Sequence, residues 1–289
     1  MDNDSGMPLQ LQQKPESATR LVHWLVAPFA AFTRHRDLTR ELTKREILGR
    51  YRGASFGLLW SLFNPLLVLA VYTVAFGGIL KSRWPQQGNH DVPFGLIIFV
   101  GIIVHGLFAE CFSVAPRLMV HNANYVKKVV FPLDLLVWPL VLSALFHTLM
   151  SSVVFLLLGA VLYGHFSPLA ILLPVVLLPL VLLTVAVCWV VASLGVYFRD
   201  IGLVTPVLST ALFFLSSAIV PLQSVPPHFR IFFELNPLTF FIDQARMVTL
   251  WGQWPDWGQL GKYLLIGLVA CYLANLWFRK VSKGFADVL

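Results

Sequence analysis

The sequence has few charged residues. Only 12% of its 289 residues are Asp, Glu, Lys or Arg, whereas 57% are hydrophobic and the mean hydropathy is +0.76. A soluble domain with a large core carries more charge than this, so the composition is typical of a polytopic membrane protein. The predicted fold class is therefore an all-α membrane protein.

Cysteine is scarce, and the phosphate-binding loop of ATPases is absent. Cys111, Cys188 and Cys271 fall in apolar segments without the spacing of metal ligands, so we expect buried free thiols and no metal site. The string closest to a P-loop, Gly77–Ser82, lacks a glycine before its lysine. We therefore expect no ATP binding through a P-loop in this chain.

Ionisable residues inside the apolar segments are also few. Glu110 and Asp134 stand alone in the sequence, without the paired carboxylate that acid–base catalysis uses. His105 and His147 also lie in apolar segments, where an ionisable group is a candidate for function, although a neutral histidine also serves to bond a neighbouring helix. We predict no catalytic residues, and an enzyme is the weaker interpretation.

Six apolar segments of about 20 to 30 residues predict six transmembrane helices, since about 20 apolar residues suffice to cross a bilayer. Arg199 and Asp200 alone separate the fourth segment from the fifth, which predicts a tight turn there. The predicted spans are Leu58–Leu80, Phe94–Val114, Leu135–Tyr163, Leu169–Phe198, Ile201–Val220 and Leu260–Phe278.

The basic residues flank the predicted spans. A net charge of +7 resembles that of a nucleic-acid-binding protein, but its placement is that of membrane anchors, so no nucleic-acid partner is expected. With the N-terminus in the cytoplasm, sixteen Lys and Arg residues are cytoplasmic and five are external. The positive-inside rule then predicts a multi-pass membrane protein with both termini in the cytoplasm.

Residues 34–57 precede the first span and read as an amphipathic helix. Glu41 and Arg45, like Glu46 and Arg50, are four residues apart, which supports helix formation. Such a helix can lie in the membrane interface with its basic side chains at phosphate headgroups. The alternative is a solvated helix that only determines topology. Residues 1–33 are predicted to form a cytoplasmic tail, and only Leu21–Phe32 within it is apolar enough to touch the membrane.

Two further segments outside the spans have a distinctive composition. Pro116–Pro132 is polar and basic at its centre, which suits either a short helix that contacts a soluble partner or an ordinary connecting loop. Pro221–Trp257 is too long and too apolar for a simple loop. Prolines divide it into pieces that suit short re-entrant or interfacial helices on the external side, and an aromatic belt is the alternative.

Four motifs in order resemble a known family. They are GRYRGASFGLLWSLFNPLLVLAVYTVAF (Gly49–Phe76), VKKVVFPLDLL (Val126–Leu136), LGVYFRDI (Leu194–Ile201) and FELNPLTFFIDQAR (Phe233–Arg246). With the six predicted spans, they resemble the membrane permeases of type-2 ABC exporters for lipid-linked polysaccharides such as O-antigen, capsule and teichoic acid. The resemblance covers the chain from about Arg36 onward.

This resemblance implies half of a transporter in the bacterial inner membrane. Two copies of the chain would enclose a channel, and two copies of a separate P-loop ATPase would bind ATP and Mg²⁺. The chain itself would need no cofactor. Its other partners would be membrane lipids and the cargo, a polyprenyl-diphosphate-linked polysaccharide.

The resemblance also implies roles for individual residues. Residues 58–289 would form the six-span permease domain, with a coupling helix at about 118–128 that contacts the ATPase, while residues 34–57 would form a gate helix and residues 221–257 an external gate. The coupling residues would be Asn122, Asn124, Tyr125, Lys127 and Lys128; the gate-helix residues at the lipid headgroup Arg45, Arg50, Tyr51 and Arg52; and the external-gate residues Phe233, Asn236, Pro237 and Arg246.

Aromatic side chains are the candidates for the wall of the channel, because a ring can stack on the C–H face of a sugar without selecting one sugar sequence. The candidates are Trp60, Phe63, Tyr72, Phe76, Phe213 and Phe214. The alternative is that these rings face lipid or a neighbouring helix. Two other functions stay open, export of drugs or small lipids by the same fold and a membrane enzyme acting on polyprenyl-linked sugars.

Overall fold

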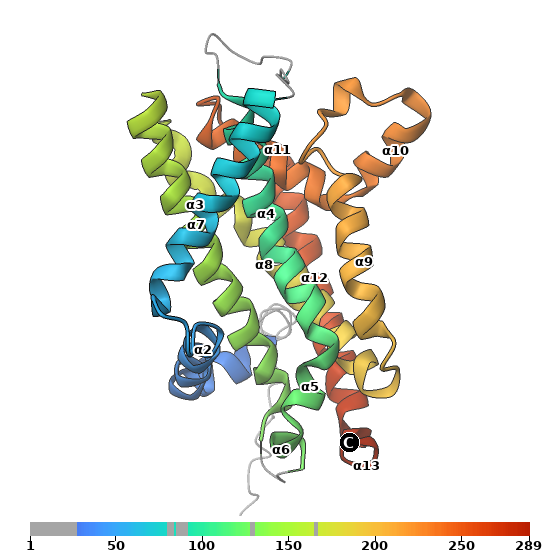
Figure 1. Ribbon diagram of the computed structural model, residues 1–289. Coiled ribbons are helices and arrows are strands. Elements are labelled where there is room, and N and C mark those ends of the chain that lie inside the picture. The colour runs from blue at the N-terminus through green and yellow to red at the C-terminus, as the bar shows by residue number, and fades with distance from the viewer. Residues whose placement is uncertain (1–27, 80–83, 85–91, 128–130, 165–166) are drawn as a thin grey trace, which may run out of the picture.

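The computed structural model describes residues 28–79, 84, 92–127, 131–164 and 167–289, and in these ranges the chain is helical with no strand (Figure 1). The α-helices are α2 (Arg36–Arg50), α3 (Trp60–Tyr72), α4 (Phe94–Val114), α5 (Leu118–His121), α6 (Ala123–Val126), α7 (Val137–Tyr163), α8 (Leu173–Tyr197), α9 (Ile201–Phe214), α10 (Pro227–Leu235), α11 (Pro237–Thr249), α12 (Trp257–Val281) and α13 (Phe285–Val288). Short turns of 3₁₀-helix connect several of them, and a π-helical segment, Thr73–Ile79, extends α3.

Five helical segments are long and apolar enough to cross a membrane. They are Gly57–Ile79, Phe94–His121, Leu133–Val161, Pro168–Tyr197 and Trp257–Val288. Each overlaps one predicted span, so five of the six predicted helices are present. The chain is therefore a multi-pass membrane protein built from helices.

The remaining predicted span, Ile201–Val220, is a shorter helix than expected. Helix α9 has 14 residues, or about 21 Å at 1.5 Å per residue, whereas the hydrocarbon core of a bilayer measures about 30 Å. The helix ends at Phe214 because local polar groups take over its last carbonyls: Ser216 Oγ donates to Phe213 O at 2.7 Å, and the Asn236 amide donates to Leu215 O at 3.0 Å. The structure thus does not confirm a sixth full-length span. The turn predicted at residues 199–200 is present.

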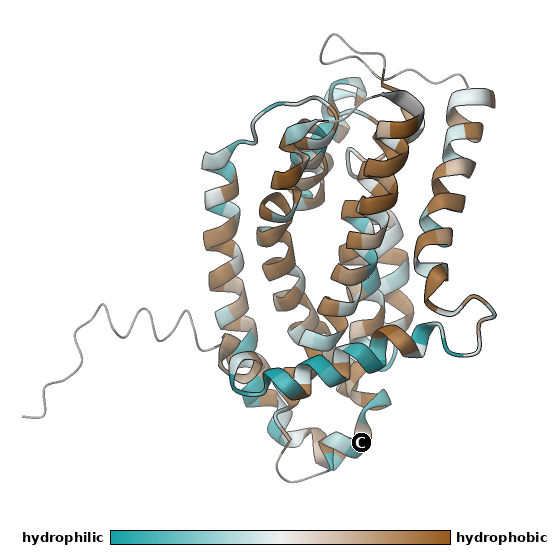
Figure 2. Ribbon diagram, turned by 90° about the vertical axis from the view of Figure 1, so that its left-hand side faces the viewer, coloured by the Kyte–Doolittle hydropathy of each residue, from teal (hydrophilic) through white to brown (hydrophobic). Residues whose placement is uncertain are grey.

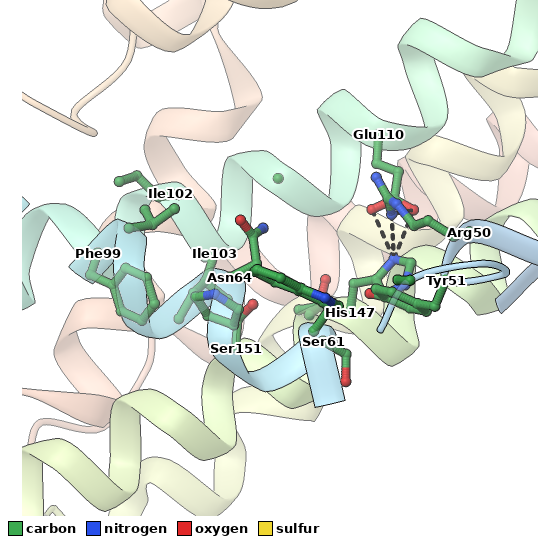
Figure 3. Close-up of a pocket in the computed structure, with 16 residues that line it drawn as sticks. Arg50, Tyr51, Ser61, Asn64, Phe99, Ile102, Ile103, Glu110, His147 and Ser151 are labelled. Atoms are coloured by element: carbon green, nitrogen blue, oxygen red, sulfur yellow. Dashed lines mark hydrogen bonds and ion pairs between the residues drawn. The ribbon is translucent and has the colours of Figure 1, made fainter. Parts of the chain in front are cut away.

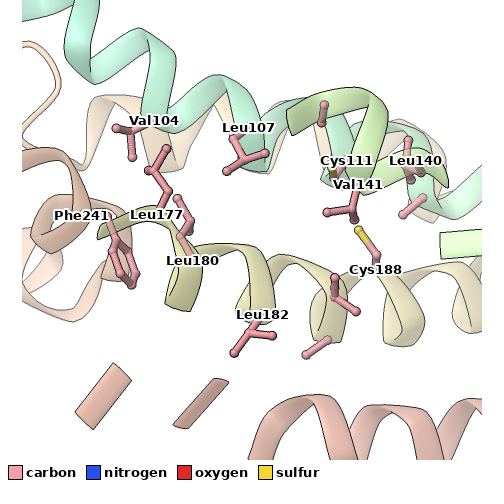
Figure 4. Packing of buried hydrophobic residues seen from close by; sticks show 14 of the residues in the cluster. Val104, Leu107, Cys111, Leu140, Val141, Leu177, Leu180, Leu182, Cys188 and Phe241 are labelled. Atoms are coloured by element: carbon pink, nitrogen blue, oxygen red, sulfur yellow. The ribbon is translucent and has the colours of Figure 1, made fainter. Parts of the chain in front are cut away.

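The core lies where α4, α7 and α8 meet (Figure 4). Trp189 is fully buried in it, and Cys111 and Cys188 lie in the same layer. Cys271 on α12 donates its thiol to Leu182 O at 3.0 Å. All three cysteines are buried and free, which confirms the prediction made from their apolar surroundings.

Helix α2 lies crosswise under one end of the bundle and is its most hydrophilic helix (Figure 2). Thr39 and Leu42 are buried against the bundle, while Leu38 and Leu48 are exposed. A helix was expected here, and one is found over Arg36–Arg50, with turns in place of its predicted last residues.

The ion pairs predicted within α2 do not form between the described side chains. Neither Glu41 with Arg45 nor Glu46 with Arg50 is within salt-bridge distance. Both arginines instead reach other elements of the protein.

Candidate functional site

A cavity of about 470 Å³ opens where α2 meets the bundle. Side chains of α3, α4 and α7 and of the end of α2 line it. Figure 3 shows that the cavity is charged at one end, around Arg50 and Glu110, and apolar at the other, around Phe99 and Ile102. The cavity can therefore hold a ligand with an anionic head and an apolar body.

The charged end is a cluster of three side chains from three helices. Arg50 Nη1 on α2 donates to Glu110 Oε1 on α4 at 2.6 Å. Nδ1 of His147 on α7 lies 2.9 Å from the same oxygen and 3.1 Å from Glu110 Oε2. It also lies 2.7 Å from Arg50 Nη1, so Nδ1 donates to Glu110 when it carries the proton and accepts from Arg50 when it does not.

The cluster is only partly shielded from solvent. The side chains of Arg50, Glu110 and His147 are 51%, 20% and 14% exposed. A partly solvated ion pair contributes little to stability, because each charge gives up contacts with water in order to contact the other. The exposed part of the Arg50 guanidinium is thus open to another anion.

Tyr51 covers the histidine of this cluster. Its ring lies edge-on to His147, with 5.9 Å between ring centroids. Burial raises the pKa of the Tyr51 phenol above its usual value, the charge of Arg50 opposes this, and that of Glu110 adds to it. Tyr51 therefore stays a neutral hydrogen-bonding group, whereas Arg52, the next predicted gate residue, is exposed.

Helix α2 also contacts the segment predicted to couple to an ATPase. Arg45 Nη1 donates to Tyr125 Oη at 3.0 Å, and its guanidinium carbon lies 5.7 Å from the centroid of that ring. Two side chains assigned by resemblance to different devices, the gate helix and the coupling helix, thus touch each other. Their separation by 80 residues hides this contact from the sequence.

The segment predicted to be a coupling helix forms two short helices rather than one. Helices α5 and α6 meet at Asn122, whose amide donates to Leu118 O at 2.9 Å. Asn124 and Lys127 are exposed, and Tyr125 is partly buried. The remaining predicted contact, Lys128, lies outside the described residues.

The channel candidates form two groups on opposite sides of α4 (Figure 1). On α3 and its extension, Tyr72 and Phe76 stack with 5.8 Å between centroids and 5° between ring planes, which confirms that they share a helix face. On α9, Phe213 packs on His105 at 4.8 Å and Phe214 is exposed.

The remaining two rings lie near the cavity. Trp60 and Phe63 are both partly exposed and meet edge-on at 6.2 Å, and Trp60 also lines the cavity described above. The structure thus offers rings to lipid or to a second chain at both α3 and α9.

The predicted external gate lies at the other end of the bundle, in α10 and α11, and its polar residues are buried. Arg246 is fully buried: Nε donates to Ile97 O at 3.0 Å, Nη1 to Ser217 O at 2.6 Å and Nη2 to Ala218 O at 2.8 Å. Trp84 covers the guanidinium, with 4.4 Å between Cζ and the ring centroid. This side chain ties α4, residues 217–218 and α11 together.

The other predicted gate residues begin α11. Asn236 accepts a hydrogen bond from Leu238 N at 3.1 Å as the N-cap, and its amide holds the last carbonyls of α9. Pro237 follows at the first helical position, which its restricted φ favours. Phe233 on α10, which precedes Asn236 by three residues, is also buried. These residues connect α9, α10 and α11.

The side chains of the other histidine and the other acid of the apolar segments, His105 and Asp134, each have a polar partner. His105 Nε2 lies 3.0 Å from Ser209 O on α9, and Arg279 Nε lies 4.0 Å from the Asp134 carboxylate. Within the described part of the chain, no group of three His, Cys, Asp or Glu side chains is placed to hold a metal ion.

The cluster of Arg50, Glu110 and His147 was missed in the sequence, where each residue was considered alone. The available signal was that Glu110 and His147 each lie in a span, where an ionisable group needs a partner. Which partner each one takes depends on how α4 and α7 pack, and no local pattern encodes that.

The profile of the ABC-2 type transporter family matches residues 37–250. The O-antigen export system permease protein RfbA of Myxococcus xanthus is 26% identical over 256 residues, which are 88% of this chain and 95% of that protein. RfbA of Klebsiella pneumoniae is 23% identical over 255 residues with the same coverage. The polysialic acid transport protein KpsM of Escherichia coli is 24% identical over 242 residues, 81% of this chain and 90% of that protein.

Proposed function

Because the chain belongs to the ABC-2 type transporter family, we propose that it is the permease subunit of an ATP-driven exporter of lipid-linked polysaccharide. Membership makes the chain a membrane transport subunit rather than an enzyme, and it confirms the resemblance carried by the four motifs. The observation that carries the cargo class is that permeases named for O-antigen export and for polysialic acid transport match most of the chain. The polymer would move from the cytoplasmic to the external face of the bacterial inner membrane.

The proposed topology has six crossings with both termini in the cytoplasm. The five long helical segments supply five crossings, and the short helix α9, fifth in chain order, would supply the other one together with residues 215–220. The supporting observations are the excess of Lys and Arg on one side and the position of α2, α5, α6 and the C-terminus at the same end of the bundle (Figure 1). Helices α10 and α11 would then be the external re-entrant helices.

The proposed assembly contains two copies of this chain and two copies of a separate ATPase that binds ATP and Mg²⁺. Exposed apolar side chains on α3 and α9 support a second copy, among them Val71 (64% exposed) and Val207 (68% exposed). The exposed Asn124 and Lys127 support residues 118–128 as the docking segment for the ATPase. Aromatic rings on α3 and α9 would line the channel between the copies.

The cavity at α2 is the proposed loading site. The diphosphate of a polyprenyl-linked cargo would take Arg50 away from Glu110, because a phosphate group offers more charge than the carboxylate it replaces. The apolar end of the cavity would receive the first part of the lipid. His147 would hold Glu110 in place when Arg50 leaves.

The proposed coupling runs from the ATPase through α6 to α2. Closure of the ATPase would move residues 118–128, and the contact between Tyr125 and Arg45 would pass this movement to the helix that carries Arg50. Residues 115–117 would pass it to α8, because Gly195 packs directly against the Pro116 carbonyl.

Deletion of the gene tests this proposal. We expect loss of one surface polysaccharide and accumulation of its lipid-linked form inside the cell. Altered drug tolerance with normal surface polymer would instead favour a drug or small-lipid exporter, and turnover of polyprenyl-linked sugar by the purified chain alone would favour an enzyme.

A pull-down tests the partner. The tagged chain, purified in mild detergent, should bring down a P-loop ATPase in equal amount. Lys127→Glu should weaken this association, whereas Lys283→Glu, an exposed charge reversal near the C-terminus, should not. Equal recovery of the ATPase by Lys127→Glu would remove the docking assignment.

A further inference from the structure

A second cavity lies at the opposite end of the bundle from α2. It measures about 410 Å³, within the range of roughly 300–1,000 Å³ typical of small-molecule sites. Residues 221–223 and helices α10 and α11 form its walls, together with Trp84 and Trp251. None of the channel, gate-helix or coupling residues named above lines it.

The side chains that line this cavity are those that bind sugars. A sugar ring has an apolar C–H face that packs on an indole, and hydroxyl groups that both donate and accept hydrogen bonds. Here Trp84 and Trp251 supply the indoles, Arg230 supplies donors, and Glu234 and Asp243 supply acceptors. Charged partners of this kind make stronger hydrogen bonds to hydroxyls than neutral ones do.

The buried Arg246 keeps part of this cavity in place. It covers one side of the Trp84 ring and lies 3.4 Å from Asp243 Oδ1, which also accepts from Ser217 Oγ at 2.7 Å. Among the described residues, both hydrogen bonds to Asp243 end on Oδ1, so Oδ2 is left for a ligand. Burial raises the pKa of the Asp243 carboxyl, while Ser217 and Arg246 oppose the rise.

Arg230 adds a donor without a partner. Its Nε is buried and makes no hydrogen bond within the described part of the chain, where Nη2 donates one long bond of 3.4 Å to Val225 O. A buried donor left unpaired costs free energy, so the guanidinium gains little from its present position and can turn toward a ligand.

We propose that this cavity binds a short, hydroxyl-rich stretch of neutral saccharide as it leaves the membrane. The lining holds Arg230 and two carboxylates, and Arg246 pairs with one of these carboxylates from behind, so the cavity has no excess of positive charge to attract acidic sugars. The inference rests on the proposed export function and adds a binding site for the sugar itself. It gives the external segment a second role, because a site that holds emerging sugar keeps the polymer from sliding back.

Binding measured on the full-length chain in lipid nanodiscs tests the proposal. The probe is a set of short oligosaccharides, cut from the polymer that disappears from the cell surface when the gene is deleted. Saturation-transfer NMR gives the dissociation constant. We expect Trp251→Ala and Glu234→Gln each to weaken binding about tenfold, the first because it removes the indole face and the second because it removes the charge from one hydrogen bond.

Two variants control for folding and for general tryptophan loss. Trp251→Phe keeps an aromatic face and should keep most of the affinity. Trp254→Ala removes an exposed indole, 65% accessible and outside the cavity, and should leave binding unchanged. Glu234 is exposed, so its replacement by Gln does not threaten the fold.

The outcomes separate this inference from the proposed function. If deletion leaves every surface polymer unchanged, the export function fails before the cavity is tested, and the inference falls with it. If deletion removes a polymer but its oligosaccharides do not bind, or bind Trp251→Ala and Glu234→Gln as tightly as wild type, export stands and the saccharide site is wrong.

Discussion

Two arginines at opposite ends of the molecule show two uses of the same side chain. Arg246 is fully buried and donates to three backbone carbonyls, so it holds α4, residues 217–218 and α11 in one arrangement. Arg50 is half exposed and bonds a carboxylate and a histidine. Carbonyls held in place by the fold offer Arg246 no alternative, whereas the Arg50 pair is open to competition from any anion.

This difference indicates which end can rearrange. A buried charge is stable only with its full set of partners, so Arg246 holds the three segments around it in one arrangement. The end that contains Arg50 has a partly solvated ion cluster, a helix lying across the bundle and two short helices joined by one contact to it. We expect substitutions at the first end to change stability and substitutions at the second to change transport.

The largest expected effect is that of Arg246→Met. The substitution leaves three buried carbonyls without their donors, and each costs about 1–3 kcal/mol, so we expect a loss of more than about 3 kcal/mol. The measurement is the melting temperature of the purified chain in detergent. Arg230→Gln, on α10, is the matched control and should melt near wild type. Unchanged melting of Arg246→Met would show that this end is not held by the arginine.

The next effect is that of Gly195→Ala at the other end. An added Cβ would fall on the Pro116 carbonyl, so α8 and residues 115–117 must separate, at a cost of roughly 1–3 kcal/mol. Gly261→Ala on α12 has open space around its Cβ and should melt at or above the wild-type temperature. If the two variants melted at the same temperature, α8 and residues 115–117 would adjust to the added methyl group without loss of stability.

A smaller effect on stability is expected for Glu110→Gln. The variant keeps the shape of the side chain and removes its charge, so the links from Arg50 and His147 weaken by about 1 kcal/mol or less. A double-mutant cycle with Arg50→Gln measures the coupling between the two side chains, and Glu46→Gln, on the same helix as Arg50, is the control. We expect export of the surface polymer to fall more than stability does. A coupling free energy of zero would contradict the interaction between Arg50 and Glu110.

The smallest effect on stability is expected for Tyr125→Phe. The substitution removes the hydroxyl that accepts a hydrogen bond from Arg45, so the free energy of unfolding should stay within about 0.5 kcal/mol of the wild-type value. Both variants, Tyr125→Phe and Arg45→Gln, should lower the amount of polymer exported per ATP hydrolysed. Arg45→Gln should lower it at least as much as Tyr125→Phe, because it also removes the contact between the guanidinium and the ring. If neither variant lowers this ratio, the contact is not the path of coupling.

The sequence was most informative where one local property decides the structure. Apolar length predicted the long helices, and the spacing of Tyr72 and Phe76 predicted their shared face, because helical geometry alone determines both. The end of α9 was not predictable in the same way. It depends on Asn236, twenty-two residues beyond Phe214, which returns to bond the last carbonyls of that helix.

The candidate sites show the same limit. The resemblance singled out Arg45, Arg50 and Arg246, but it did not give their partners, and the structure shows Arg246 tying three segments together. The ion pairs expected within α2 do not form, because Arg45 and Arg50 contact partners on α6 and α4 instead. A charge beside a span gains more from a partner at the membrane surface than from a solvated neighbour.

What the sequence by itself determined is the class of this protein. Its low charge, its long apolar segments and its unequal flanking arginines and lysines follow from composition and from distances along the chain, and a bilayer acts on each segment separately. Tertiary structure alone decided that Arg50 meets Glu110 and His147, that Arg45 meets Tyr125, and that two tryptophans share a cavity with Arg230. These side chains meet only because long helices pack side by side, which brings residues tens to hundreds of positions apart within a few ångströms.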